Sequence, residues 1–546
     1  MAEVLSYAHG ASSIPLLGET IGANLARTVG AHPDDEALVS RHQGVRYTYA
    51  ELDRAVDEIA AGLLSLGLEK GDRLGIWSPN CAEWVLLQYA TARLGVILVN
   101  INPAYRTSEL EYVLRQSSCS VLVSATTFKT SDYRSMVEEV RPSLTDLGTV
   151  IYLGEGEWDA VVAAGRAAGA SAVRAREADL DFDDPINIQY TSGTTGFPKG
   201  ATLSHHNILN NGFFIGERCG YTERDRVCIP VPFYHCFGMV LGNLACTTHG
   251  AAMVIPAPAF DPLATLETVE AESCTSLYGV PTMFIAELEH PEFERFDLTS
   301  LRTGIMAGSP CPVEVMKQTV TRMHMDEVTI CYGMTETSPV STQTEVTDSL
   351  EHRVSTVGRV HPHVEVKVID PATGRTVPRG VAGELCTRGY SVMVGYWNDE
   401  ERTREAIDAV GWMHTGDLAT MDADGYVNIV GRSKDMIIRG GENVYPREIE
   451  EFLYGHEDIA DVQVVGVPDP RYGEEILAWV QVRDGRMLTE EEVKEFCRGR
   501  IAHFKVPRYV LFTDAMPMTV TGKIQKYKLR EMGVEALRLE GTGPTA

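Results

Sequence analysis

The sequence predicts an α/β protein: a large N-terminal domain of helix-covered sheets that includes a β-rich subdomain, and a small α+β domain at the C-terminus. Three observations predict this class. Helical and strand-like patterns alternate over residues 1–150, which is typical of a parallel sheet covered by helices. Short strand-like runs separated by turn residues occupy residues 358–430, and helix–strand alternation resumes beyond Gly431. The 546 residues suffice for roughly three or four domains of average size.

The first elements follow from hydrophobic periodicity. Thr48 and Glu51 have the spacing of a capping box, and apolar residues recur at helical intervals from Leu52 to Leu66, so a helix is expected there. Further helices are expected over residues 82–94 and 107–116, and strands over 73–77, 96–101, 120–124 and 186–189. A polar, alanine-rich stretch at residues 155–184 is expected to lie on the surface.

The later elements are shorter. In the β-rich segment, strands are expected over residues 364–369, 383–387 and 426–429. The C-terminal region is expected to contain helices over 446–454 and 489–501 and strands over 461–467 and 476–483. The charged residues 431–435 lie where the pattern changes. We therefore predict one domain over residues 1–433 and a second, movable one over residues 434–546.

Net charge excludes one class of partner. Lys+Arg total 48 and Asp+Glu total 76, which gives a formal charge of −28. A generic nucleic-acid-binding protein needs a basic surface to neutralise phosphates, so nucleic acid is not an expected partner. An anionic membrane surface is disfavoured for the same reason. A site for a small anion remains open, with its positive charge supplied locally.

Cysteine usage and the apolar segments indicate a reducing, cytoplasmic location. The 11 cysteines include no CxxC pair, which is typical of reduced, mostly buried thiols. The N-terminal residues lack the basic and apolar regions of a signal peptide. The most apolar helical stretch, residues 84–99, contains Gln88 and Arg93, so stable membrane insertion is not expected.

The segment Tyr190–Gly200, YTSGTTGFPKG, carries the strongest functional signal. Its glycines permit tight folding with N–H groups directed at an anion, its hydroxyls donate, and Lys199 adds a cation, so the segment can wrap the phosphates of a nucleotide. The alternative is a solvated hairpin loop with no ligand. A Walker A loop is excluded because Lys199 lies three residues after Gly196 and is followed by Gly200 instead of Ser or Thr.

The same segment resembles the signature loop of the adenylate-forming superfamily, which includes acyl-CoA synthetases, luciferases and the adenylation domains of peptide synthetases. Further motifs match in the expected order over almost the whole chain: MAGSP at 306–310, YGMTET at 332–337, TGD at 415–417, GRSKDMI at 431–437 and GKI at 522–524. YHCF at 234–237 and RSKDMIIRGGEN at 432–443 are most similar to medium-chain fatty-acyl-CoA synthetases. The resemblance implies an AMP-forming acid–thiol ligase that makes acyl-AMP and pyrophosphate, then acyl-CoA and AMP.

The resemblance also implies which residues hold ATP. They are Thr191, Ser192, Gly193, Thr194, Thr195, Gly196, Phe197, Pro198, Lys199, Gly308, Ser309, Pro310, Tyr332, Gly333, Asp417 and Arg432. Tyr332 offers a flat face for adenine and Asp417 can accept from two ribose hydroxyls. The alternatives are a core aromatic for Tyr332, an Asx-turn residue for Asp417 and a surface ion pair for Arg432.

Catalytic roles fall on four residues. Glu336 suits Mg²⁺, which takes few carboxylates together with phosphate oxygens, and Thr335 can hydrogen-bond the α-phosphate. The alternative for this pair is a helix N-terminus with an acidic first turn. By resemblance, Lys523 bridges the carboxylate and the α-phosphate. His235 is either a polar group near the acyl carboxylate or a satisfied core histidine.

The second half-reaction implies a domain that moves. By resemblance, Lys434 is the hinge and the backbone at Gly440 and Gly441 approaches the pantetheine arm of coenzyme A, although two adjacent glycines also suit a plain turn. The adjacent His205 and His206 have no second pair at metal spacing, and the DADG run at 422–425 suits a hairpin turn, so both are interpreted as structural.

The acyl pocket is expected to be apolar, with Phe237, Gly238, Met306 and Met334 in its wall. The absence of an acid near His235 argues against amino-acid substrates, and no carrier domain follows Lys523, which favours free CoA. The alternatives are an acyl-AMP ligase that loads a carrier protein, a ligase for an aryl or other small carboxylic acid, a nucleotide-binding regulator without turnover, and a phosphotransferase that makes ADP. The oligomeric state stays open, with a homodimer among its alternatives.

Overall fold

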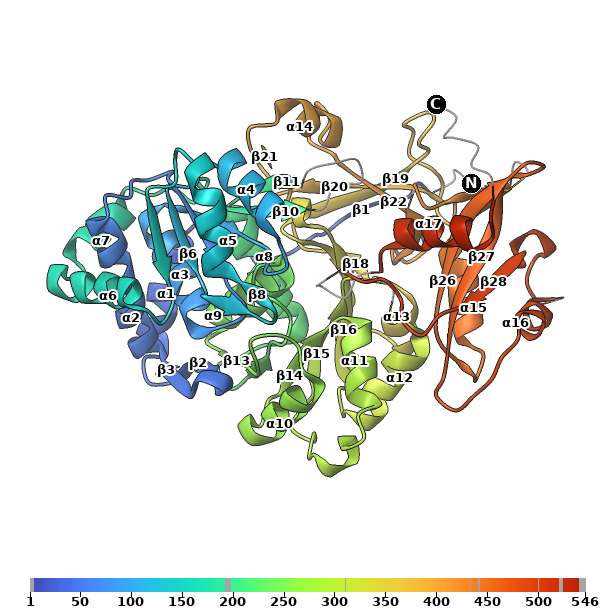
Figure 1. The fold of residues 1–546 in the computed structure, drawn as a ribbon, viewed down its shortest axis with the longest axis horizontal. Coiled ribbons are helices and arrows are strands. Elements are labelled where there is room, and N and C mark those ends of the chain that lie inside the picture. Colours follow the sequence, from blue (N-terminus) through green and yellow to red (C-terminus); the bar gives the residue numbers. More distant parts are fainter. Residues whose placement is uncertain are drawn as a thin grey trace.

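The computed structural model of the protein describes residues 4–191, 198–309, 311–432, 434–439, 442–498, 500–519 and 524–539. The described residues form four large sheets, and helices cover the sheets that the first two thirds of the chain build (Figure 1). The expected α/β class is confirmed, since parallel sheets alternate with helices before a smaller antiparallel sheet and a C-terminal α+β unit follow.

The first sheet has the order β21-β11-β10-β5-β4-β6-β9. Its strands are β4 (Arg73–Trp77), β5 (Ile97–Asn100), β6 (Val121–Ser124), β9 (Thr149–Tyr152), β10 (Pro185–Thr191), β11 (Lys199–Ser204) and β21 (Gly395–Tyr396). The helices α2 (Tyr49–Ser65), α3 (Ala82–Leu94), α4 (Thr107–Gln116) and α5 (Tyr133–Val140) lie around it (Figure 1). The capping box of Thr48 and Glu51 is confirmed, with both reciprocal hydrogen bonds formed.

The second sheet has the order β18-β17-β16-β15-β14-β12-β13-β2-β3. Its strands are β2 (Glu36–Ser40), β3 (Val45–Thr48), β12 (Arg226–Cys228), β13 (Ala252–Ile255), β14 (Ser276–Gly279), β15 (Thr303–Ala307), β16 (Glu327–Gly333), β17 (Val340–Gln343) and β18 (Arg359–Val360). Its helical elements are α1 (Ile21–Ala31), α8 (His205–Cys219), the π-helix Phe237–Leu244, α9 (Ala245–His249), α10 (Pro262–Glu272), α11 (Pro281–Leu288), α12 (Val313–Arg322) and α13 (Leu350–Ser355). The fully buried central strands lack the alternation that reveals a strand in sequence.

The β-rich subdomain is an antiparallel sheet with the order β1-β19-β20-β22-β23. Its elements are β1 (Tyr7–His9), β19 (Val364–Ile369), β20 (Gly383–Gly389), β22 (Met413–Met421) and β23 (Val427–Arg432), with α14 (Glu400–Ala406) beside it. The N-terminal strand β1 was not expected, and it pairs with β19 far along the chain. The DADG hairpin turn is confirmed, because Asp422 Oδ1 accepts from the amides of Asp424 and Tyr426, each at 2.9 Å.

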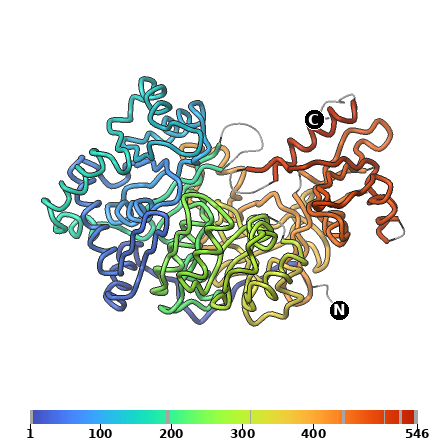
Figure 2. The backbone as a smooth tube through the Cα atoms, turned by 60° about the horizontal axis from the view of Figure 1, so that its bottom comes forward, coloured from blue at the N-terminus to red at the C-terminus, as the bar shows by residue number. Residues whose placement is uncertain are grey.

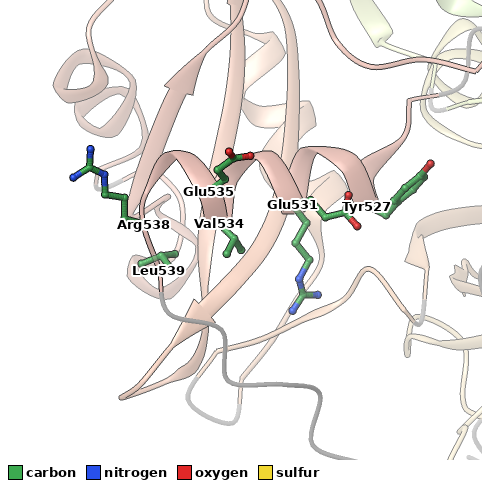
Figure 3. Close-up of a pocket in the computed structure, with 7 residues that line it drawn as sticks. Tyr527, Glu531, Val534, Glu535, Arg538 and Leu539 are labelled. Atoms are coloured by element: carbon green, nitrogen blue, oxygen red, sulfur yellow. The ribbon is translucent and has the colours of Figure 1, made fainter.

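The C-terminal unit forms a lobe at one end of the molecule (Figure 2). Its elements are β24 (Ile437–Arg439), β25 (Glu442–Val444), α15 (Pro446–Tyr454), β26 (Ile459–Asp469), β27 (Gly473–Val482), α16 (Glu490–Cys497), β28 (Tyr509–Phe512) and α17 (Lys526–Ala536). A surface hollow runs along α17, and Tyr527, Val534 and Leu539 are among the residues that line it (Figure 3). None of the predicted site residues lines this hollow.

The expectation that residues 155–184 lie on the surface was wrong in part. They form α6 (Gly156–Ala168) and α7 (Ser171–Ala178), and Trp158, Val161 and Val173 on them are buried in the main hydrophobic core. Helix α6 packs closely on α2, as Gly165 requires: a Cβ at this position would lie 1.7 Å from the carbonyl oxygen of Glu58.

Two further expectations concern the burial of the cysteines and helices that could cross a membrane. All 11 cysteines are described, buried and free, which confirms the expectation of buried thiols. None of the helices in the described part of the chain has the length and apolar character that a membrane crossing needs.

Candidate active site

The Thr/Gly segment forms the connection of a β-hairpin. Strands β10 and β11 pair antiparallel, with Thr191 opposite Lys199. A Walker A loop joins a strand to a helix, so this hairpin geometry agrees with the exclusion made from the spacing. Ser192, Gly193, Thr194, Thr195, Gly196 and Phe197 lie outside the described residues, and their phosphate-binding role stays a prediction. The described ends, Thr191 and Pro198–Lys199, show where the segment leaves and re-enters the sheet.

Glu336 meets the start of this hairpin. It lies in a short 3-10 turn, Thr335–Thr337, that directly follows β16, and its exposed fraction is 5%. Its Oε1 accepts from Tyr396 Oη at 2.8 Å and from Thr191 Oγ1 at 3.4 Å. The turn is too short to be the helix N-terminus of the alternative interpretation. A buried carboxylate oriented by two hydroxyls beside a candidate phosphate loop is a hard oxygen ligand that fits Mg²⁺.

Tyr396 is a site residue that the sequence analysis missed. It lies on β21, which pairs with β11, and the Nζ of Lys199 lies 4.9 Å from the centre of its ring. Burial and the neighbouring Glu336 carboxylate hold the pKa of Tyr396 well above its ordinary value, so the phenol stays protonated and donates. The only signal in the sequence is an aromatic pair, Tyr396-Trp397, after a glycine in a turn-rich region.

Tyr332, Asp417 and Arg432 form a second connected group. Tyr332 Oη donates to Asp417 Oδ2 at 2.6 Å, and Arg432 Nε donates to Asp417 Oδ1 at 3.0 Å. Asp417 and Arg432 are paired opposite each other on β22 and β23. Burial and the carboxylate raise the pKa of Tyr332, and the carboxylate raises that of Arg432. Each carboxylate oxygen has a second lone pair, so Asp417 can still accept from sugar hydroxyls.

The residues predicted to flank the adenine ring lie at the ends of two adjacent parallel strands. Gly308 follows β15 and Tyr332 is near the end of β16, and these strands pair with Ala307 opposite Cys331. Ligand crevices of open parallel sheets occur at such carboxyl ends. Gly308 has a φ of +91°, which favours glycine, and Ser309 is half-buried beside it. Pro310 lies outside the described residues.

Glycine at position 333 has a steric reason. A Cβ on Gly333 would lie 1.8 Å from the carbonyl oxygen of Pro339, the residue just before the paired strand β17. The residue therefore permits the close return of the chain around the Thr335–Thr337 turn. Its predicted contact with ATP remains a prediction.

His235 lies next to the Thr335 turn. Its Nδ1 accepts from the amide of Phe237 at 3.1 Å, and the adjacent Cys236 Sγ lies 4.0 Å from Thr335 Oγ1. His235 is half-buried.

His205, which was interpreted as structural, is fully buried, and burial lowers its pKa to about 4. Its Nδ1 accepts from the amide of Ile21 at 3.2 Å, which supports that interpretation.

The predicted acyl-pocket residues divide between two packed clusters. Phe237 belongs to the main core cluster, where it lies 5.7 Å from the ring of Tyr278, and Met334 packs against the same large cluster. Gly238 is the second residue of the buried π-helix that Phe237 starts, and a Cβ there would lie 2.5 Å from the carbonyl oxygen of Pro232. Met306 is fully buried in a separate cluster. The side chain of Met306 therefore packs apart from those of Phe237 and Met334.

The predicted C-terminal residues are only partly described. Lys523, Gly440 and Gly441 lie outside the described residues. Lys434 lies between β23, which ends the β-rich sheet, and β24, which begins the C-terminal sheet. Arg447 Nη1 donates to the carbonyl of Ile429 at 2.7 Å across this junction. The position of Lys434 agrees with a connection between two units, and its hinge role stays a prediction.

Known protein families and proteins are similar to this chain over most of its length. A family described as "AMP-binding enzyme" matches residues 25–397, and one described as "AMP-binding enzyme C-terminal domain" matches residues 448–523. The putative acyl-CoA synthetase YngI of Bacillus subtilis (strain 168) is 51% identical, over 96% of this chain and 99% of that protein. The mitochondrial medium-chain acyl-CoA ligase ACSF2 of Danio rerio is 48% identical, over 98% of this chain and 91% of that protein.

A solved structure shows the same fold with an adenylate bound. The anthranilate CoA ligase AuaEII in complex with anthranoyl-AMP has a TM-score of 0.86 and 26% identity, covering 96% of this chain and 99% of that chain.

Proposed function

The chain belongs to the AMP-binding enzyme family, and we propose that it is an ATP-dependent acyl-CoA synthetase acting on medium-chain fatty acids. The resemblance to adenylate-forming enzymes is thereby confirmed. The enzyme joins a carboxylate to AMP with release of pyrophosphate, and then transfers the acyl group to the thiol of CoA with release of AMP. The substrate class follows the relatives named medium-chain acyl-CoA ligases.

The convergence at Glu336 carries this proposal. Hydroxyls from β10 and β21 orient one buried carboxylate, and Lys199 lies over the ring of Tyr396 that donates to it. Adenylation brings an anionic acid to a polyanionic nucleotide, so this repulsion must be screened where the phosphoryl group transfers. Mg²⁺, when bound by Glu336 and phosphate oxygens, supplies that charge. Thr335 is proposed to donate to the α-phosphate.

Binding of the nucleoside is proposed to depend on the second group. Asp417, itself paired with Arg432, would hold the phenol of Tyr332 in place through the hydrogen bonds already described, so that the ring can face adenine. A side chain held in this way loses little entropy when ATP binds.

The second half-reaction is proposed to use the C-terminal unit. Lys523 would bridge the carboxylate and the α-phosphate in the first step and withdraw for the second, while Gly440 and Gly441 would receive the pantetheine arm. A rotation about Lys434 would exchange these surfaces. The placement of Lys434 between two separate sheets supports this proposal.

The acyl chain is proposed to lie beside the π-helix. Phe237 and Gly238 begin this helix, and the amide of Phe237 donates to His235, which would border the pocket on its polar side; Met334 would complete the apolar wall. Met306 would contribute to the pocket only through its backbone, since its side chain packs elsewhere. A cytoplasmic location and a homodimer are proposed as well; fractionation and size-exclusion chromatography with light scattering test them.

The decisive experiment measures AMP and thioester for carboxylic acids of increasing length, with and without CoA. The proposal expects pyrophosphate release with medium-chain acids, and acyl-CoA plus AMP only when CoA is present. An adenylate that accumulates with CoA but reaches a carrier protein would identify an acyl-AMP ligase. A preference for aryl acids would change the substrate class. ADP as product would favour a phosphotransferase, and no turnover with any acid would favour a regulator.

A further inference from the structure

Three metal-ligating side chains converge in the β-rich sheet, outside the groups already described. Glu384 and Cys386 are two residues apart on β20, so their side chains share one face of the sheet. His414 on the antiparallel strand β22 is the direct partner of Cys386 and projects from the same face. One ligand atom from each of the three lies within 4.8 Å of the others. The register of β20 and β22, which Figure 1 labels in the same sheet, therefore places glutamate, thiol and imidazole together.

The spacing of these atoms matches the edges of a tetrahedral site. His414 Nδ1 lies 3.1 Å from Glu384 Oε2 and 3.7 Å from Cys386 Sγ. With metal bonds of about 2.0–2.1 Å to N or O and about 2.3 Å to S, ligand atoms around zinc lie roughly 3.3–3.6 Å apart. The same imidazole nitrogen faces both other ligands. A side-chain adjustment of a few tenths of an ångström would bring both atom pairs into coordination geometry.

We infer that Glu384, Cys386 and His414 form a binding site for a thiophilic divalent cation of the Zn²⁺ class. Binding replaces the S–H bond of Cys386 by an S–Zn bond and releases that proton to solvent, with no change of oxidation state. Three protein ligands leave a fourth position for water. Asp408 Oδ2 lies 4.0 Å from His414 Nε2, on the side of the ring opposite the site, where a carboxylate that moved into hydrogen-bond distance would orient a ligating histidine.

The surroundings favour a cation over a simple ion pair. Cys386 is fully buried beside Ile369 and Trp412. A Glu384–His414 ion pair accounts for two of the three groups, but not for a thiol sulfur that lies 3.7 Å from the same imidazole nitrogen. The cations nearby, Lys367 and Arg388, lie over Trp412 at 4.4 and 4.5 Å. The two acids, Glu384 and Asp408, balance the charge that a divalent ion adds.

The site adjoins the part of β22 that carries Asp417. Glu384 Oε1 accepts from the amide of Gly416 at 3.1 Å, and Thr415 Oγ1 donates to the carbonyl of Leu385 at 2.7 Å. A bound ion would therefore fix residues Thr415–Asp417 of β22 against β20. The inference itself depends on β20 and β22 alone, not on the function proposed above.

Cobalt tests the thiolate ligand directly. Full-length protein titrated with Co²⁺ is expected to develop the sulfur-to-cobalt charge-transfer band at one equivalent, and one equivalent of Zn²⁺ is expected to abolish it. Cys386→Ser should lose the band, while Cys119→Ser, at a buried cysteine in the first sheet, should keep it. Absence of the band in the unchanged protein, or its persistence in Cys386→Ser, would overturn the inference.

A second pair of measurements separates binding from folding. The side chain of His414 is 32% exposed, so His414→Gln is expected to fold and to bind Co²⁺ at least ten-fold more weakly. Zn²⁺ should raise the thermal unfolding midpoint of the unchanged protein and of Cys119→Ser, but not of His414→Gln. An equal Zn²⁺ effect in all three proteins would contradict a site at these residues.

Discussion

The body of the molecule and its C-terminal lobe hold their functional residues in different ways. In the body, strands from distant parts of the chain orient Glu336, Tyr332 and Asp417 through short hydrogen bonds. The lobe contacts the body through exposed or peripheral groups, such as the pair of Arg483 Nη1 and Glu289 Oε1 at 3.1 Å. The difference teaches that the residues proposed to bind the nucleotide are held by hydrogen bonds within the body, whereas the predicted bridging lysine belongs to the lobe. Affinity and turnover should therefore respond separately to mutation.

The largest effect is expected at Lys523, which belongs to the lobe. Lys523→Ala should lower acyl-AMP formation by about 10²- to 10³-fold, the scale for removing one group that stabilises transition-state charge. Thioester formation from supplied acyl-AMP should be nearly unchanged, because the lysine is proposed to leave before that step. Pyrophosphate release and acyl-CoA formation measured separately would check this. Equal loss of both steps would abolish the proposed division between lobe and body.

Glu336 tests the body side of the comparison. Glu336→Gln keeps the shape but removes the charge, and about a hundred-fold loss of adenylation is expected, with a steeper dependence on free Mg²⁺. Glu327→Gln, at the start of the strand β16 that leads to the turn of Glu336 and paired with Arg302 at 2.6 Å, is the matched control and should keep normal Mg²⁺ dependence. A Glu336→Gln enzyme with unchanged response to Mg²⁺ would remove the assigned role.

Tyr396 is a positioning residue in this scheme. Tyr396→Phe removes only the hydroxyl that donates to Glu336, so the KM for Mg²⁺-ATP should rise about ten-fold, consistent with roughly 1.4 kcal/mol for a hydrogen bond to a charged group. Tyr426 Oη donates to Asp348 Oδ1 at 2.6 Å and makes the same kind of bond away from the site. Tyr426→Phe should cost similar stability and leave the KM unchanged, and equal KM values for the two variants would contradict the proposal.

The rigidity of the body rests on close helix contacts. Gly165→Ala should destabilise the fold by about 1–3 kcal/mol, because the added methyl overlaps the backbone of α2. Gly156→Ala on the same helix meets no atom within 4 Å and should be close to neutral. Denaturant unfolding followed by circular dichroism measures both. Similar stability for the two variants would show that the helices α2 and α6 separate easily.

The smallest effect is expected at the junction. Arg447→Ala removes one hydrogen bond to the carbonyl of Ile429, which is worth about 0.5–1.5 kcal/mol. Limited proteolysis near residues 431–435 should become a few-fold faster, because the lobe is held less firmly. Arg486→Ala, which removes an ion pair with Asp458 at 3.3 Å within the lobe, should leave the cleavage rate unchanged. Faster cleavage in both variants would place the effect inside the lobe.

The sequence predicted correctly those helices that depend on residues close together in the chain. Residues 82–94 and 107–116 form helices with the expected bounds, as does Pro446–Tyr454, because their apolar spacing and end residues suffice. The central strands of the second sheet were not assigned, since burial on both faces removes the alternation. The burial of Trp158 and Val161 depends on Gly165 meeting α2, which no local pattern contains.

The residues of the candidate site were likewise predicted only in part. The motifs that contain Thr191, Glu336 and Asp417 could be found because glycine, hydroxyl and acidic residues cluster there. The hydrogen-bond partners of these residues could not be found from the sequence. Tyr396 donates to Glu336 from 60 residues away, and Tyr332 donates to Asp417 across 85 residues. A tyrosine in a turn carries no spacing that reveals its partner. The group of Glu384, Cys386 and His414 was missed for the same reason, because strand register brings it together.

The pairing of β11 with β21 limits how this candidate phosphate loop could be transplanted. Ala201 lies opposite Tyr396 and Thr202 opposite Gly395, so one ladder of backbone hydrogen bonds joins the strand that begins with Lys199 to the strand that supplies the phenol. A graft of only the hairpin β10–β11 onto a new scaffold would omit β21, the strand that pairs with β11. The smallest portable unit consists of three strands, one of them drawn from almost two hundred residues downstream.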